Sequence, residues 1–221
     1  MSTDSKYVGV GIYTFQQAAR LLGVSGNLLR YWIGEFSAES VVKRQLKDDH
    51  LLTFAELMEL HFIKMFRDED VSLQAIRKAA NEAAKKFHTD YPFTVKRFDT
   101  DGRSIFATLK SKETDCELVE ELRHGQLVFK TLIKAFFKKL DYHGTAEIER
   151  FWPMQKSGRV VLDPSRKFGK PIDFETGIST DVLFNAVNAG GGQDEQVVAQ
   201  WFDVPLEAVK AAVRYERTLA T

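Results

Sequence analysis

Apolar residues recur at helical spacing in two short segments near the start of the chain. The first segment opens with Thr14 and Gln17 at the spacing of a capping box, and its apolar stripe comprises Phe15, Ala18, Ala19 and Leu22. Gly23 suits the left-handed residue that ends a helix, and Ser25 suits the N-cap of a second helix. The inward positions of that second helix are Leu28, Leu29, Trp32 and Ile33. The pattern predicts a helix-turn-helix whose second helix turns small, polar and cationic residues outward: Gly26, Asn27, Arg30 and Tyr31.

The same periodicity predicts two longer helices downstream. The segment "LTFAELMELHFIKMF" opens with a second capping box, Thr53 to Glu56, and is strongly apolar. Ser72 is expected to cap the next helix, whose apolar positions are Leu73, Ile76, Ala79, Ala80 and Ala83. The segment "HTDYPF", which contains Pro92, then ends the helical run.

The middle of the chain combines strand and helix patterns. In "FTVKRFDTDGRSIFATL" two β-rich runs flank Asp101 and Gly102, a dipeptide typical of two-residue hairpins. A helix is expected over residues 127–140, with inward positions Phe129, Leu132, Ile133, Phe136 and Phe137. Its outer stripe, either a solvated face or a phosphate-binding one, comprises Lys130, Lys134 and Lys138. "IERFWP" and "RVVLDP" are expected as short strands, so this region is predicted to be a small α+β module.

The end of the chain repeats the helix-turn-helix pattern of its start. Three helices are predicted there: residues 180–189, residues 195–202, and one that begins at Pro205. The last two align with residues 18–33 at a constant offset of 180 positions, and the apolar positions of the two segments coincide. The outer face of the second copy comprises Glu207, Lys210, Ala211 and Arg214. A glutamate at the leading end of a recognition helix would repel phosphate, so the first copy is expected to read DNA and the second to bind protein or to dimerise. A DNA contact of the second copy through the basic loop of residues 156–170 stays an alternative.

Composition limits the possible functions. Lys plus Arg and Asp plus Glu both number 31 in 221 residues, so any nucleic-acid surface needs local charge clustering. Cys116, the only cysteine, excludes an intramolecular disulfide and is expected in the core. The chain has no signal-peptide pattern and no apolar run of membrane length, so a cytoplasmic location is expected. Its histidines lack metal-ligand spacing and it has no phosphate loop, so we expect no enzyme activity, no catalytic residues, no metal and no cofactor.

The segments "YTFQQAARLLGVSGNLLRYWI" and "LTFAELMELHFIKMFRDEDVSLQAIRKA" resemble the N-terminal DNA-binding domain of MerR-type regulators, over residues 12–87. The resemblance implies a winged helix-turn-helix that binds operator DNA as a homodimer. The residues this assigns to DNA are Asn27, Arg30 and Tyr31 on the recognition helix and Lys43, Arg44 and Lys47 in the wing. The sequence departs from the family where the wing usually carries Arg-x-Tyr, because residues 50–54 read "HLLTF" here. The long dimerising helix of many members is also missing.

Residues 160–217 resemble a small helical family often labelled VapB-type antitoxin-like. The landmarks are Asp163-Pro164, the loop Phe168–Pro171, and Arg214-Tyr215-Glu216. The two resemblances together imply a DNA-binding antitoxin of a type II toxin-antitoxin pair, which represses its own operon and neutralises a PIN-like ribonuclease toxin. Basic segments would then cover the acidic active site of the nuclease. The candidate residues are Lys156, Arg159, Arg166, Lys167, Lys170, Arg214 and Arg217.

The expected fold is mainly α with a small α+β middle module between a MerR-like winged helix-turn-helix and a three-helix, helix-turn-helix-like domain. The expected domains are residues 1–90, 91–158 and 159–221. The alternative function is a stand-alone MerR-like regulator whose middle module senses a small ligand. The aromatic residues of that module are more typical of a core than of a ligand site.

Overall fold

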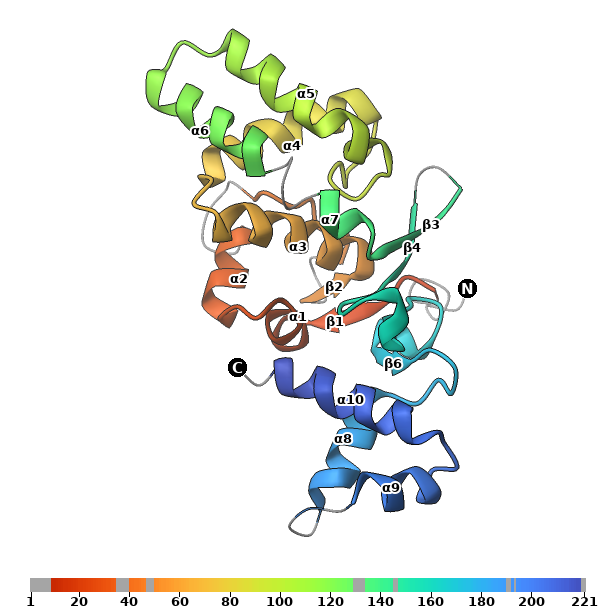
Figure 1. Cartoon of the computed structure of the whole chain (residues 1–221). Coiled ribbons are helices and arrows are strands. Elements are labelled where there is room, and N and C mark those ends of the chain that lie inside the picture. Colours follow the sequence, from red (N-terminus) through yellow and green to blue (C-terminus); the bar gives the residue numbers. More distant parts are fainter. Residues whose placement is uncertain are drawn as a thin grey trace, which may run out of the picture. The chain divides into compact units, whose positions relative to one another are not determined.

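The computed structural model describes residues 9–34, 40–46, 50–128, 134–144, 147–189, 192 and 194–219. The chain forms two compact units (Figure 1). The helical unit is Thr14–Ile148, and the terminal unit combines Met1–Tyr13 with Glu149–Thr221. The middle module expected from the sequence contributes its helices to the helical unit. The division into three domains stays a prediction.

The helical unit consists mainly of helices, coloured red to green in Figure 1. A short strand, β1 (Ile12–Thr14), leads into it. Its described elements are α1 (Phe15–Leu22), α2 (Gly26–Trp32), β2 (Leu51–Thr53), α3 (Phe54–Asp68), α4 (Leu73–Phe87), α5 (Arg97–Lys112), α6 (Cys116–Val128), α7 (Lys134–Phe137) and β3 (Leu140–His143). The predicted N-caps Thr53 and Ser72 are confirmed, because each hydroxyl accepts the backbone amide three residues on.

The core of the helical unit is built around α3. The ring of Phe62 lies 5.0 Å from that of Phe136, 5.3 Å from that of Phe137 and 6.3 Å from that of Phe98. The carboxylate of Glu59 is also buried and accepts hydrogen bonds from the backbone amide of Phe93 at 3.2 Å. Burial raises the pKa of Glu59 well above its usual value. This core therefore joins residues of α3 to partners that lie 34 to 75 positions later in the sequence.

The predicted hairpin around Asp101 and Gly102 is wrong, because these residues lie inside α5. Phe98, Ile105 and Phe106 are buried on one face of that helix. This face packs against α4 and α6, and the ring of Phe106 lies so close to Gly125 that a Cβ there would meet it at 2.7 Å. In Figure 1 α5 and α6 run side by side. Tertiary packing of an apolar helical face thus overrides the local turn preference of Asp-Gly.

The predicted helix over residues 127–140 has other limits in the structure. Its first residues belong to α6, Leu127 is 50% exposed, and Leu140 begins β3. The inward positions Phe136 and Phe137 are confirmed as buried, and Lys138 is exposed. Phe129, Lys130, Leu132, Ile133 and the side chain of Lys134 lie outside the described part. The expectation of a buried cysteine is also wrong, because Cys116 is the exposed first residue of α6.

The terminal unit combines a small antiparallel sheet with three helices. The strands β4 (Glu147–Phe151), β5 (Val160–Leu162) and β6 (Pro171–Asp173) pair in that order, with Phe151 opposite Leu162 and Val161 opposite Ile172. The helices α8 (Thr180–Asn188), α9 (Glu195–Trp201) and α10 (Leu206–Thr218) bury a core of Leu183, Val198, Ala199, Val209, Ala212 and Val213. The predicted strands and helices of this region are confirmed, and with them the mainly α fold with small sheets.

Candidate nucleic-acid interface

The helix-turn-helix near the start of the chain forms as its caps predict. The Thr14 hydroxyl accepts the amide of Gln17 at 3.2 Å, while the Thr14 amide donates to the Gln17 side chain at 2.9 Å. Gly23 has a φ of 64° and ends α1, and the Ser25 hydroxyl caps α2. The left-handed conformation at Gly23 turns the chain within three residues, which sets α2 against α1.

The outer face of α2 is exposed as predicted for a recognition helix. Asn27, Arg30 and Tyr31 are exposed, whereas Leu29 and Trp32 are buried. The inward position predicted for Leu28 is wrong, because its side chain is 40% exposed. One helical step of about 100° carries it from the side of Leu29 to the outer face. The exposed surface therefore offers an amide, a guanidinium, a phenol and one apolar contact, all of which occur in base and phosphate recognition.

The described part of the predicted wing, residues 40–46, is held by a buried carboxylate. Glu56 accepts the backbone amides of Gln45 and Thr53, each at 2.6 Å, and its oxygen lies 3.5 Å from Nε of Arg44. Arg44 also donates to the carbonyl of Leu51 at 2.7 Å, and its side chain is only 6% exposed. Contact between this guanidinium and DNA would require breaking a buried ion pair. Glu56 therefore ties together the wing, β2 and the start of α3.

Arg44 also connects the wing to the first helix. Its guanidinium lies 5.0 Å from the centre of the Phe15 ring, and the ring of His50 meets Phe15 edge-on at 6.0 Å. The MerR-type resemblance assigns Arg44 to DNA through its place in the wing. The signal that points to the other role is the capping-box Glu56, an acid expected to lie partly inside the fold.

Lys43 is the exposed cation of the described wing. Its ammonium donates to the carboxylate of Asp90 at 2.7 Å, and both side chains are more than half exposed. An ion pair this exposed contributes little to stability and can exchange for a phosphate. Lys47, the third predicted wing residue, lies outside the described part of the chain.

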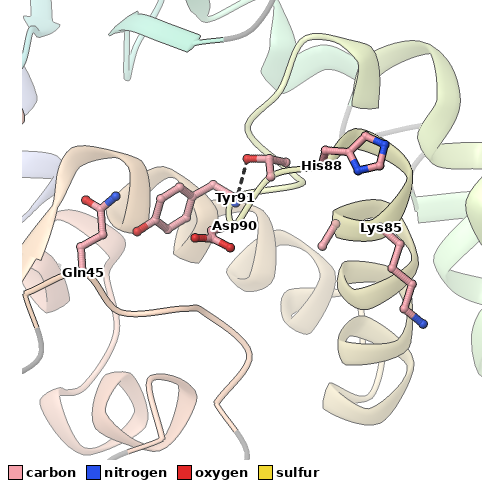
Figure 2. Close-up of a pocket in the computed structure, with 7 residues that line it drawn as sticks. Gln45, Lys85, His88, Asp90 and Tyr91 are labelled. Atoms are coloured by element: carbon pink, nitrogen blue, oxygen red, sulfur yellow. Dashed lines mark hydrogen bonds between the residues drawn. The ribbon is translucent and has the colours of Figure 1, made fainter.

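A cavity of about 610 Å³ lies beside the wing, between Gln45 and the end of α4. Figure 2 shows the ring of Tyr91 pointing toward Gln45, with Asp90 next to it. The remaining lining residues include Lys85 and His88 from the C-terminal end of α4. The cavity is wide and open, and it adjoins the same Asp90 that pairs with Lys43.

The second helix-turn-helix copies the backbone of the first. The amide of Val24 donates to Ala19 at 3.0 Å, and 180 positions later the amide of Val204 donates to Ala199 at 3.0 Å. The left-handed residue of the turn is Gly23 in the first copy and Asp203, with a φ of 50°, in the second. The predicted repeat is thus a repeat of backbone geometry.

The outer faces of the two copies differ. Where α2 exposes Asn27 and Arg30, α10 places Glu207 and Lys210, and these two pair with each other at 3.3 Å. Arg214 and Arg217 are exposed further along α10. The acid at the leading end of α10 places a negative charge where Asn27 stands on α2, and this charge would repel a phosphate.

The predicted basic loop of the terminal unit contains two kinds of cation. The exposed ones are Lys156, Lys167 and Lys170. Arg159 instead makes a two-point ion pair with the buried Asp173, at 2.7 and 3.1 Å, and Arg166 donates to the carbonyl of Phe174 at 2.9 Å. Burial alone would raise the pKa of Asp173, but hydrogen bonds from Arg159 and Thr176 outweigh it and lower that pKa. Arg159 and Arg166 therefore hold the loop in shape.

The first helix-turn-helix and the helices that follow it match a known family. Residues 13–83 match the family model described as "MerR HTH family regulatory protein". Residues 13–83 form a MerR-type helix-turn-helix domain. The matched segment runs from the end of β1 into α4 and includes both capping boxes and α2. This match supports a DNA-binding helix-turn-helix of the regulator class in the N-terminal part of the chain.

Two comparisons match nearly the whole length of the chain. A Mycobacterium tuberculosis protein named "Putative antitoxin VapB45" is 23% identical over 226 residues, which cover 92% of this chain and 93% of that protein. The X-ray crystal structure of Rv2018 from Mycobacterium tuberculosis superposes with a TM-score of 0.73 at 22% identity, covering 93% of this chain and 98% of that one. The structural similarity shows that this chain has the same fold as Rv2018.

Two negative observations apply to the described residues. Within them, no helix has both the length and the apolar character that crossing a membrane requires. The same residues contain no cluster of three or more His, Cys, Asp or Glu side chains arranged to hold a metal ion.

Proposed function

We propose that the protein is a DNA-binding antitoxin that represses its own operon and neutralises a PIN-like ribonuclease toxin. The observation that carries the first half is the exposed polar and cationic face of α2 within a MerR-type domain. Support for the second half is the whole-length similarity to a protein named as an antitoxin.

In this proposal DNA is read by α2 and supported by the wing. Arg30 and Asn27 contact base edges or phosphates in the major groove, and Tyr31 contacts the sugar-phosphate backbone of the DNA. Lys43 leaves Asp90 to pair with a phosphate, whereas Arg44 keeps the wing in place from within. One module of this size rarely supplies enough affinity, so the protein is proposed to bind a palindromic site as a homodimer.

The terminal unit is proposed to bind the toxin. The exposed cations Lys156, Lys167, Lys170, Arg214 and Arg217 complement the acidic active site that the antitoxin resemblance implies for a PIN-like nuclease. The glutamate at the leading end of α10 would repel phosphate, which argues against DNA as the ligand of that helix. The complex would form in the cytoplasm.

The test is co-purification from the native cell followed by a ribonuclease assay. Tagged full-length protein should retain a small nuclease, and adding the purified protein to that nuclease should abolish RNA cleavage at a stoichiometric ratio. Recovery of the chain alone, together with operator binding, would instead identify a regulator without a toxin partner.

A second candidate function is a stand-alone MerR-type regulator that senses a small ligand. The observation that favours it is the cavity beside the wing, since a ligand there would contact Gln45 on the wing side and Asp90, the partner of Lys43 (Figure 2). Occupation of the cavity would then alter the DNA-facing wing directly. The co-purification experiment separates this candidate from the antitoxin.

A further inference from the structure

The terminal unit carries an exposed phenyl ring on a left-handed loop. The consecutive residues Lys167, Phe168 and Gly169 have φ values of 48°, 56° and 81°. This conformation is unfavourable for any residue with a Cβ and rare for a bulky one. Phe168 nevertheless has 63% of its surface exposed. A ring held outward on a strained backbone contributes little to the fold, which points to a role in binding.

A buried hydrogen bond fixes the loop of residues 167–169. The Tyr13 hydroxyl, which is buried, donates to the carbonyl of Gly169 at 2.7 Å. Burial raises the pKa of Tyr13 well above its usual value, so the hydroxyl remains a donor. A Cβ at position 169 would lie 2.3 Å from that hydroxyl, so only glycine fits. Two residues before the ring, Arg166 donates to the carbonyl of Phe174 at 2.9 Å, and Phe168 is therefore presented on an anchored loop.

The surroundings of the ring are cationic. Between Pro164 and Ile172 the sequence contains Arg166, Lys167 and Lys170 and no acidic residue. Lys167 and Lys170, which flank the ring in sequence, are both exposed. A surface of this composition complements an apolar pocket whose rim carries carboxylates. Duplex DNA would satisfy the cations but holds its apolar base faces stacked, so the ring could enter only by unstacking them.

We propose that Phe168 anchors this protein to its protein partner, with the ring filling an apolar pocket and Lys167 and Lys170 pairing with carboxylates on the rim. The inference rests on the proposed function, which makes that partner the PIN-like ribonuclease. The proposed function assigns toxin binding to exposed cations, and this inference adds one apolar contact, the Phe168 ring. The hydrogen bond from Tyr13 to Gly169 keeps the loop in the conformation that exposes the ring.

The experiment is isothermal titration of the full-length protein with the purified PIN-like ribonuclease of its own operon. Phe168→Ala should weaken binding at least tenfold, and so should the double variant Lys167→Glu/Lys170→Glu. The matched control is Trp201→Ala, because Trp201 is also 63% exposed but has Gln200, Phe202 and Asp203 beside it instead of cations. That control should change affinity less than about twofold. Promoter binding and melting temperature should stay unchanged in Phe168→Ala.

Each other outcome counts against the proposal in a distinct way. Absence of binding by the unaltered chain overturns the toxin partner and the anchor together. Binding that Phe168→Ala leaves intact overturns the anchor alone. Loss of promoter binding with ribonuclease binding retained would make the loop a nucleic-acid contact. Should Phe168→Ala lower the melting temperature by more than about 5 °C, the Lys167→Glu/Lys170→Glu variant decides, and unchanged affinity in it overturns the proposal.

Discussion

At the scale of single residues, the role of a cation depends on whether its side chain is buried against a carboxylate or exposed. Arg44 is expected beside Lys43 in the DNA-contacting wing, and Arg159 is expected beside Lys167 in the basic loop. In the structure Arg44 pairs with Glu56, 12 positions later. Arg159 pairs with Asp173, 14 positions later. Such partners are too far along the chain for local patterns to identify, whereas the outward direction of Arg30 follows from helical periodicity alone.

The two kinds of cation should separate in a stability measurement. Arg159→Ala leaves the buried carboxylate of Asp173 without its ion pair and should lower the free energy of unfolding by about 3 kcal/mol. Lys167→Ala removes an exposed cation and should change it by less than about 0.5 kcal/mol. Urea denaturation of both variants measures the difference. Equal stability in the two would mean that Arg159 is not structural.

A pH dependence is expected from His61. Burial lowers its pKa from 6.5 to about 3, and nearby Lys64 adds to the effect. Between these values the unfolded chain binds a proton that the folded chain does not, so the free energy of unfolding falls as the pH drops from about 6.5. Moving from pH 7 to pH 5 should cost at most about 2 kcal/mol through this group.

Chemical denaturation of the unaltered protein and of His61→Gln at both pH values tests this expectation. The variant should lose less stability on acidification, because glutamine does not titrate. The buried Glu59 acts with the opposite sign, since its raised pKa favours the folded state as the pH falls. It is present in both proteins and cancels from the comparison. The same loss of stability in both would contradict the assignment.

At the scale of elements, the sequence predicts helices whose caps and apolar stripe agree and fails where two local signals compete. The helices α1 to α4 have N-caps and periodicity in agreement, and all four form as expected. In α5 the Asp-Gly dipeptide favours a turn while Phe98, Ile105 and Phe106 favour a helix. Packing against neighbouring helices decides that conflict, and it involves residues that the local sequence does not contain.

The two turns of the repeat allow a paired prediction. Gly23→Ala places a Cβ on a left-handed residue with no atom within 4 Å, so its cost is one of backbone conformation and should be about 1 kcal/mol. Asp203→Gly removes the same cost at the equivalent position and should stabilise the protein by up to about 1 kcal/mol. Thermal unfolding of both variants measures the effects. Destabilisation of both would mean that the Asp203 side chain outweighs its backbone conformation.

At the scale of the whole molecule, two compact units carry the same helix-turn-helix backbone with different outer faces. The sequence predicts this contrast from Arg30 against Lys210 and Asn27 against Glu207, because exposed positions on a helix follow from its periodicity. It does not predict the left-handed loop that presents Phe168, since no residue of "SRKFGK" except the glycine favours that conformation. The central claim is that the first helix-turn-helix binds DNA and the second binds a protein partner.

A mobility-shift titration of the protein's own promoter tests that claim, with the equivalent variants Arg30→Ala and Lys210→Ala compared against random DNA of equal length. The unaltered protein should prefer its promoter and lose affinity steeply with salt. Arg30→Ala should weaken specific binding by about 1–3 kcal/mol, whereas Lys210→Ala should leave it within about twofold, because the adjacent Glu207 repels phosphate from that face of α10. Equal affinity of the unaltered protein for promoter and random DNA, or loss of promoter binding in Lys210→Ala but not in Arg30→Ala, would contradict the account.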